Sequence, residues 1–148
     1  MKAIVYVSKA SIPFDVPDLL ELARLASECN ADLGITGYLW FNKGQFIQYI
    51  EGEAEPLDAL MGRIEKDDRH QVLNHTMDSE VASRRFPSWS MRYLREEDFV
   101  EISLENILAD QLLLMRPSAF QMKDWDRQIW GTIESLSSLQ ERMQMKTA

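Results

Sequence analysis

Short stretches with apolar side chains on both faces predict strands whose two sides are covered. The first is "AIVYVS" at residues 3–8, and the second is "ITGYLWF" at residues 35–41. The third is "GQFIQYIEG" at residues 44–52. The intervening "NKG" at 42–44 predicts a tight turn, so the second and third strands should form a hairpin. Further strands are predicted within "VLNHTMDSEV" and over "WSMRYL", residues 89–94.

Between the predicted strands, two stretches have the apolar spacing of an amphipathic helix. The first spans about residues 18–28, with Pro17 before it and a loop predicted at residues 30–34. Its apolar stripe consists of Leu19, Leu22, Ala23, Ala26 and Cys29. The second is "EPLDALMGRIEKD", with Pro56 in its first turn. Its inward positions are Leu57, Leu60, Met61 and Ile64.

The order strand, helix, strand, strand, helix, strand predicts a ferredoxin-like α+β fold with an added fifth strand. Both helices then cover one face of the sheet, and the second apolar face needs its own cover. Two amphipathic helices, at residues 103–115 and 118–146 and separated by "RPS", are predicted to supply it. We expect a sheet domain over residues 1–94 and a helical extension over residues 95–148, which packs on the sheet or in an oligomer.

Composition excludes several classes of function. The chain has 148 residues and a net charge of −8, and its basic residues are scattered, which argues against a nucleic-acid partner. Its single cysteine, Cys29, excludes an internal disulfide. No signal peptide and no apolar run long enough to span a membrane is visible. We therefore expect a soluble, cytoplasmic protein.

Metal and hydrolytic chemistry have little support in the sequence. His70, His75 and Cys29 do not have the spacing of a metal site, and both histidines are expected at the surface. No glycine-rich phosphate loop occurs, because "GEAEP" lacks the Gly and Lys that would follow. A hydrolase of the acylphosphatase type would need an Arg after the first strand, where "SKASIPF" offers only Lys9.

Gln48 is the polar residue that most needs an explanation. It lies in the middle of a strand, on the face it shares with Phe46 and Ile50. A buried amide without partners costs about 1–3 kcal/mol, and this one has four hydrogen-bonding positions to satisfy. Tyr6 could satisfy one of them, and a flat polar ligand between the two helices could satisfy the rest and also suit Asn30.

Other polar or aromatic residues each have an ordinary interpretation as well. Tyr6 can pack in the core with its hydroxyl at an edge, and Asn30 can be a helix C-cap. Trp89 and Met91 can pack together on one face of the fifth strand. The run "GRIEKDDRH" is either a solvated helix end or a place where Arg63 and Arg69 reach a phosphate or polyol tail.

Taken in order, these residues resemble the BLUF family of blue-light sensors that use flavin. The matching runs are "VYVS" with Tyr6, "GITG" after Asn30, "FIQYIEG" with Gln48, "RIEKDDRH" at 63–70 and "RRFPSWSM" at 84–91. Together they extend over roughly the first 94 residues. The tail with "RPSAF" is similar to that of short single-domain members, which carry two helices instead of a fused enzyme.

The resemblance implies a flavin ring held between the two helices. It implies that Asn30 bonds the pyrimidine edge and that Gln48 bridges flavin N5/O4 and the Tyr6 hydroxyl. Strand face and helix stripe add Leu25, Phe46 and Ile64 as candidates to line the ring. The remaining candidate flavin contacts come from the 63–70 run and are Arg63, Asp67, Arg69 and His70. FAD is the expected flavin, with FMN and riboflavin as alternatives.

The resemblance also implies a photocycle. Tyr6 would supply an electron and a proton, the Gln48 amide would rearrange or tautomerise, and the absorption would shift to the red. Trp89 and Met91 on the fifth strand would relay the change by exchanging positions near Gln48. Cys29 departs from the pattern, because many relatives carry His or Asn, which can make a polar or stacking contact, before the flavin-binding Asn.

The expected function is thus a non-enzymatic photoreceptor. It would signal to a separate protein or through self-assembly, since short relatives form ring-like homo-oligomers and bind response-regulator-like partners. Two alternatives stay open on the sequence: a flavin-binding adaptor of the same fold without photoactivity, and the acylphosphatase-like hydrolase.

Overall fold

A computed structural model describes residues 1–94, 111–112 and 127–138. The chain divides into two compact units, residues 1–98 and 99–148. The elements of the first unit are β1 (Lys2–Ala10), α1 (Val16–Leu33), β2 (Thr36–Asn42), β3 (Gln45–Gly52), α2 (Ala54–Glu65), β4 (His70–Asp78) and β5 (Arg92–Leu94).

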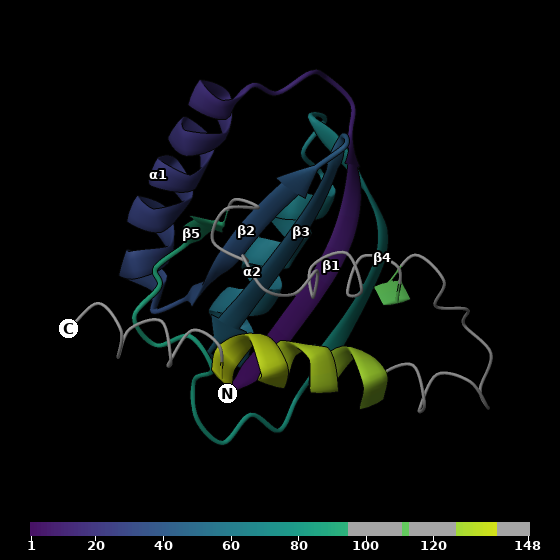
Figure 1. The fold of residues 1–148 in the computed structure, drawn as a ribbon. Helices are drawn as coiled ribbons and strands as arrows, with labels where there is room; N and C mark the ends of the chain where they lie inside the picture. Colours follow the sequence, from purple (N-terminus) through teal and green to yellow (C-terminus); the bar gives the residue numbers. More distant parts are fainter. Residues whose placement is uncertain (95–110, 113–126, 139–148) are drawn as a thin grey trace. The chain divides into compact units, whose positions relative to one another are not determined.

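The five strands form one sheet in the order β4-β1-β3-β2-β5 (Figure 1). β1 pairs antiparallel with both β3 and β4, and β2 pairs antiparallel with β3. β5 is the added edge strand and runs parallel to β2. The predicted ferredoxin-like arrangement with a fifth strand is therefore confirmed.

The β2–β3 hairpin has the predicted tight turn. Asn42 pairs with Gln45, so the loop consists of Lys43 and Gly44 alone. Their φ values are 52° and 77°, and positive φ at both loop positions is what the twist of a two-residue hairpin favours. The turn fixes the register and brings Leu39 opposite Gln48.

α1 is longer than the sequence analysis predicts. Asp15 is its N-cap and forms a reciprocal capping box with Asp18, and Gly34 ends it in the left-handed conformation at φ 67°. The loop predicted at residues 30–34 is therefore wrong, as is the interpretation of Asn30 as a C-cap. The helix ends at Gly34 because glycine adopts the left-handed conformation without a steric penalty. Asn30 therefore lies within the helix, on its buried side.

The core between the sheet and the two helices is built from alternate strand residues and helix stripes, as the apolar pattern predicts. β1 contributes Ile4 and Tyr6 to it, and β3 contributes Phe46 and Ile50. The helix side of this core includes Leu19, Leu57, Met61 and, partly buried, Leu22, Ala26, Leu60 and Ile64. Since one cluster contains residues of both helices, α1 and α2 cover the same face.

The fifth strand is shorter than predicted, and this corrects the placement of two residues. It starts at Arg92, so Trp89 and Met91 precede it and do not share a strand face. Met91 is buried in the core beneath the helices. Trp89 instead stacks on Phe86, with ring centroids 5.2 Å apart, while its backbone carbonyl accepts a hydrogen bond from the Gly37 N–H at 2.7 Å.

The second unit is described only in part. Of the helix predicted over residues 103–115, residues 111–112 are described and are helical. Residues 127–138, within the helix predicted over 118–146, are helical as well. In that helix Ile129 and Ile133 are fully buried, and Thr132 donates a hydrogen bond to Gln111 Oε1 at 2.9 Å. That these helices cover the sheet remains a prediction.

Candidate functional site

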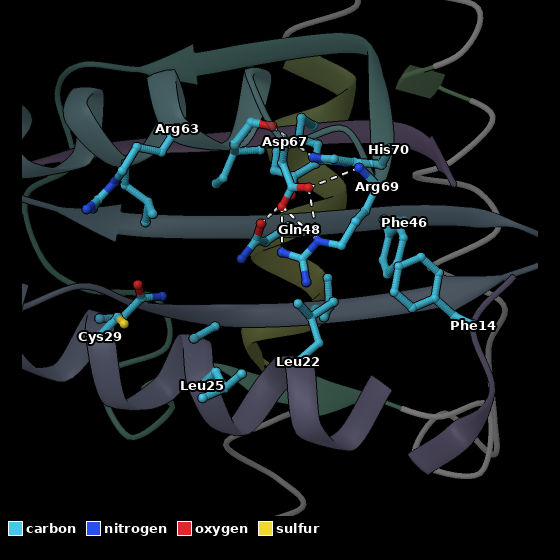
Figure 2. Close-up of a pocket in the computed structure, with 16 residues that line it drawn as sticks. Phe14, Leu22, Leu25, Cys29, Phe46, Gln48, Arg63, Asp67, Arg69 and His70 are labelled. Atoms are coloured by element: carbon cyan, nitrogen blue, oxygen red, sulfur yellow. Dashed lines mark hydrogen bonds and ion pairs between the residues drawn. The ribbon is translucent and has the colours of Figure 1, made fainter. Parts of the chain in front are cut away.

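A cavity of about 350 Å³ lies between α1 and α2, above the middle of the sheet (Figure 2). Its floor consists of side chains from three neighbouring strands: Tyr6, Leu39, Phe46 and Gln48. α1 supplies Leu22, Leu25, Ala26, Cys29 and Asn30 to its wall. Phe14 and the α2 side, with Leu60, Arg63, Ile64, Asp67, Arg69 and His70, complete the lining. The cavity therefore has an apolar body with a few polar groups, which is typical of small-molecule sites.

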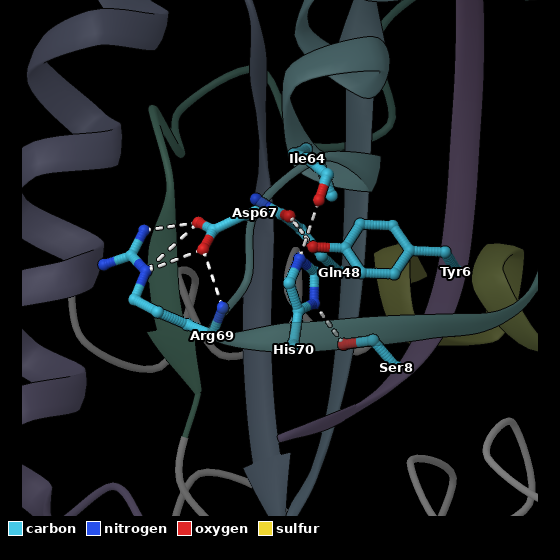
Figure 3. Close-up of polar contacts among 7 residues, drawn as sticks. All are labelled: Tyr6, Ser8, Gln48, Ile64, Asp67, Arg69 and His70. Carbon is cyan, nitrogen blue, oxygen red and sulfur yellow. Dashed lines mark hydrogen bonds and ion pairs between the residues drawn. The ribbon is translucent and has the colours of Figure 1, made fainter. Parts of the chain in front are cut away.

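The polar centre of the floor is the Gln48 amide. Tyr6 and Gln48 are cross-strand partners in the β1–β3 register, and the Tyr6 hydroxyl donates a hydrogen bond to Gln48 Oε1 (Figure 3). Gln48 Nε2 donates in turn to the Sδ of Met91 at 3.3 Å. Both side chains are almost fully buried, Tyr6 at 3% and Gln48 at 7% exposed. Because sulfur is a weak acceptor, the amide nitrogen is held less firmly than the oxygen.

Tyr6 is a neutral phenol at ordinary pH. Its burial, and to a smaller extent the nearby Asp67 carboxylate, raise the pKa of the Tyr6 hydroxyl well above its usual value. The hydroxyl thus keeps its proton and remains the donor in the bond to Gln48.

Asn30 contributes an unpaired hydrogen-bond donor to the cavity wall. The residue is 1% exposed, and its Nδ2 group is buried without a hydrogen-bond partner among the described residues. A buried donor left unpaired costs about 1–3 kcal/mol, so such groups are rare in folded proteins. A ligand with an acceptor at its edge would satisfy this donor.

The rim near the end of α2 carries an ion pair. Arg69 donates from Nη2 to Asp67 Oδ2 at 2.5 Å and from Nε to Asp67 Oδ1 at 2.9 Å (Figure 3). The hydrogen bonds from Arg69 lower the pKa of the Asp67 carboxyl to about 2. Figure 2 shows Arg63 and Cys29 at one end of the cavity and Phe14 and Phe46 at the other. Two arginines thus line a cavity whose body is apolar.

His70 connects α2 to β1. Its Nε2 lies 2.9 Å from the backbone oxygen of Ile64, and its Nδ1 lies 2.7 Å from Ser8 Oγ. A carbonyl only accepts, so Nε2 carries the proton, and in the neutral ring Nδ1 accepts from the Ser8 hydroxyl. The expectation that both histidines lie at the surface is wrong for His70, which is half-buried because these two bonds hold it inward. His75 is exposed as expected.

Comparisons with known proteins bear directly on this site. Residues 1–92 match the BLUF family, described as sensors of blue light using FAD. The chain belongs to the BLUF family. Among relatives, the beta subunit of the photoactivated adenylate cyclase of Euglena gracilis is 32% identical over 94 residues, which are 62% of this chain and 11% of that protein. This chain thus corresponds to a small part of such relatives.

Solved BLUF structures have a similar fold. The dark-state structure of BlrB, a BLUF protein, is 28% identical at a TM-score of 0.59 and covers 90% of this chain and 95% of its own. Klebsiella pneumoniae BlrP1 is 38% identical at a TM-score of 0.60, and covers 73% of this chain and 28% of its own. A further BlrP1 structure contains FMN. The cofactor of the BLUF domain is therefore a flavin, and the domain is a photosensor.

All ten cofactor-contact residues predicted from the sequence line the cavity of this BLUF domain. Of the two further photocycle residues, Met91 contacts Gln48 and Trp89 does not line the cavity. Trp89 lies in an aromatic cluster with Phe86, whose ring packs edge-on against Tyr49 at 5.1 Å. The roles assigned to these residues remain predictions.

Several lining residues of the BLUF cavity were not predicted from the sequence. Leu39 could have been found, because the two-residue turn fixes the register that places it opposite Gln48. Leu22, Ala26, Cys29 and Leu60 lie on the predicted helix stripes, yet a stripe alone does not separate core from cavity wall. Phe14 lies in the loop before α1, where the sequence gives no signal of its position.

Two other findings concern the described residues only. They contain no group of three His, Cys, Asp or Glu side chains suited to a metal ion. Across the same ranges, no helix combines the length and the apolar character that crossing a membrane requires.

Proposed function

We propose that this protein is a blue-light photoreceptor in which Gln48 is the switch. The observation that carries the proposal is the pair of hydrogen bonds made by the buried Gln48 amide at the floor of the cavity. Its oxygen accepts from the Tyr6 hydroxyl, and its nitrogen donates to the Met91 sulfur. An amide that bonds a strong donor on one side and a weak acceptor on the other can reverse without moving the backbone.

The residues present fit a flavin. Asn30 offers a buried unpaired donor, which suits a carbonyl at the pyrimidine edge of the ring. Leu25, Phe46 and Ile64 provide apolar surface for the ring faces. Arg63 and Arg69 line the same cavity and suit the polyol and phosphate groups of a tail, for which FAD is the flavin we propose.

A bound flavin supplies the absorption of blue light and accepts an electron when excited. Tyr6 is placed to give up that electron together with its phenolic proton, because its hydroxyl already donates to the neighbouring Gln48. The proton would follow the electron to the flavin by way of the Gln48 amide to which the hydroxyl donates, and Gln48 Oε1 would then lose its donor. The amide is then free to rotate or tautomerise, which exchanges donor and acceptor on the side facing the cavity and shifts the absorption to the red.

The rearranged amide changes what Met91 contacts. If Nε2 turns away, the sulfur loses its donor, and the segment that leads into β5 is released from that bond. The predicted exchange of Met91 with Trp89 belongs to this step. A bistable hydrogen-bond network coupled to one strand is the kind of element that a signalling switch needs.

We further propose that the signal leaves through a separate protein or a change in homo-oligomer assembly, in the cytoplasm. BLUF domains of the curated relatives belong to adenylate cyclase subunits. In this chain, residues 95–148 are the proposed contact for partners. Deleting residues 103–148 should cause aggregation or change the particle size by light scattering. A monodisperse truncated protein of unchanged oligomer size would contradict this role.

The test of the photoreceptor is an absorption spectrum in the dark and directly after blue light. We expect a flavin band that shifts to the red and returns in darkness. Tyr6→Phe should retain the flavin but lose the shift, since it lacks the phenolic proton, and His75→Ala, which alters an exposed residue, should behave as the wild type. Bound flavin without a shift in the wild type would indicate a flavin-binding adaptor instead.

A normal light response in Tyr6→Phe would remove Tyr6 from the electron-transfer role. A protein that cannot be loaded with flavin would contradict the proposal as a whole. The hydrolase alternative has no support in the cavity, because Lys9 is exposed and is not among the lining residues.

A further inference from the structure

Glu51 is a fully buried carboxylate outside the cavity, and the proposed photochemistry does not use it. It lies near the end of β3, opposite Ala3 on β1 and Thr36 on β2. Burial of a charge is tolerated only when hydrogen bonds satisfy it. The Glu51 carboxylate must therefore have hydrogen-bond donors on both of its oxygens.

Each oxygen of the Glu51 carboxylate accepts two hydrogen bonds. Oε1 accepts from the Tyr49 hydroxyl at 2.9 Å and from the backbone N–H of Arg85 at 2.7 Å. Oε2 accepts from the Thr36 hydroxyl at 3.1 Å and from the backbone N–H of Phe86 at 2.7 Å. Two of the four donors are thus consecutive backbone groups of a distant loop.

The neighbouring Arg84 ties the same loop to the ends of β2 and β3. Its Nη2 donates to the backbone oxygen of Gly34 at 2.5 Å, and its Nη1 donates to the Thr36 hydroxyl at 3.0 Å. Nη1 also lies 3.3 Å from the backbone oxygen of Glu51. The start of segment 84–91 is therefore fixed at one point of the sheet.

The other end of segment 84–91 reaches the switch. Trp89 is held by the Gly37 N–H, and two residues later the Met91 sulfur accepts from Gln48 Nε2. The segment between these two ends is bent, with a turn at residues 87–88, and Trp89 and Met91 lie on different faces of the sheet. To bring Trp89 to the place of Met91 beside Gln48, the segment would have to move along the sheet, and this movement would work against the bonds from Arg85 and Phe86 to Glu51.

We propose that Glu51 is a positioning residue that locks the register of segment 84–91, so that Met91 and not Trp89 contacts Gln48. Hydrogen bonds to an ionised group are about twice as strong as neutral ones, and here two of them hold adjacent backbone groups. The lock acts in the dark protein. Only its consequence for the light response rests on the proposed function.

The test is Glu51→Gln in the full-length, flavin-loaded protein kept in the dark. The readout is the ¹³C-methyl NMR signal of Met91, identified by its loss in Met91→Leu. The amide keeps the size of the side chain but replaces one acceptor oxygen by a donor, which faces a backbone N–H. The equilibrium between the two registers should shift by about tenfold or more, and a second Met91 signal should appear.

Trp89 emission gives a second readout in the same samples. Subtraction of the corresponding Trp89→Phe spectra isolates this residue from the other tryptophans, and its emission should change in Glu51→Gln as the indole leaves Phe86. Glu65→Gln is the matched control, because it makes the same charge change at an exposed position and should leave both readouts unaltered.

A Met91 signal that is identical in wild type and folded Glu51→Gln would overturn the proposal. If Glu51→Gln does not fold, Thr36→Val decides, because it removes one donor to the carboxylate, together with the acceptor for Arg84 Nη1, and leaves the loop N–H groups intact. It should produce the second Met91 signal at a lower population, and an unchanged signal would again overturn the proposal. Neither readout needs light, so a wild type without a red shift would contradict the photoreceptor while this result still stands.

Discussion

Met91 and Trp89, only two residues apart, contact opposite faces of the sheet. Met91 accepts a hydrogen bond from Gln48 in the core beneath the helices. Trp89 stacks on Phe86, and Phe86 packs on Tyr49, whose side chain points to the other face. The cation of Arg92 lies 4.9 Å from the Trp89 ring centre and adds to this placement.

The placement predicts unequal effects of two substitutions. Met91→Leu conserves volume but removes the acceptor for Gln48 Nε2, and loss of that bond should change the lifetime of the red-shifted state by about fivefold or more. Trp89→Phe should leave the dark flavin band unchanged. Absorption spectra and their recovery in darkness measure both. A shifted dark band in Trp89→Phe together with an unaltered Met91→Leu would show that Trp89 is the inner residue.

Gln48 and Tyr6 should be energetically coupled. Gln48→Leu deprives the buried Tyr6 hydroxyl of its acceptor and should lower the free energy of unfolding by about 1–3 kcal/mol. The double variant with Tyr6→Phe removes both partners and should be less destabilised than the sum of the two single changes, by about 1 kcal/mol. Urea unfolding of the flavin-free wild type, the two single variants and the double variant gives the coupling free energy of this double-mutant cycle. Strict additivity would mean that the bond contributes no stability.

Asn30 should affect stability and flavin binding in opposite directions. Asn30→Leu removes an unpaired buried donor, so the flavin-free protein should unfold at the same or a higher urea concentration. The same change should weaken flavin binding by about tenfold, because a hydrogen bond to the ring is lost. Fluorescence titration measures the affinity. Asn30→Asp keeps the shape without the donor, and if it binds flavin as tightly as the wild type, Nδ2 is not the contact.

Asp67 should make stability depend on acidic pH. Arg69 lowers the pKa of the folded carboxyl to about 2, whereas the unfolded group titrates near 3.9. The ion pair therefore stabilises the folded state above about pH 4, and this contribution disappears as the pH falls toward 2. The group is partly exposed, so the difference in unfolding free energy between wild type and Asp67→Asn should stay below about 1 kcal/mol. A difference that grows on acidification would contradict the assignment, and Asp68→Asn is a neighbouring control.

Two glycines should respond oppositely to alanine. A Cβ on Gly37, where φ is 157°, would lie 1.8 Å from the backbone oxygen of Tyr49, so Gly37→Ala should cost about 3 kcal/mol or more. Gly62 lies inside α2 with nothing within 4 Å of such a Cβ, and Gly62→Ala should stabilise by about 0.5–1 kcal/mol. Thermal unfolding compares the two. Equal effects would show that the β2–β3 spacing at Gly37 is looser than described.

The local sequence determined the strands, the hairpin and the face that each strand residue occupies. Alternation has a period of two, so Tyr6, Phe46 and Gln48 could be assigned to one face without knowledge of the rest of the chain. The turn at Lys43 and Gly44 then fixed the register. Leu25, Phe46 and Ile64 could be inferred as part of the cavity lining because helix stripes and strand faces repeat at fixed intervals.

The tertiary structure decided the features that depend on contacts far apart in the chain. The polar character of Asn30 favours an end of α1 before this residue, yet Gly34 is the residue that ends the helix and Asn30 turns into the core. His70 is drawn inward by Ser8 and by the end of α2. Alternation predicts one shared face for Trp89 and Met91, but the segment before β5 is held by the Glu51 carboxylate. Its contacts there are the backbone N–H groups of Arg85 and Phe86, which are 34 and 35 positions away in the sequence. No local pattern encodes such a contact, because its energy exists only when the distant groups have been brought together by the fold.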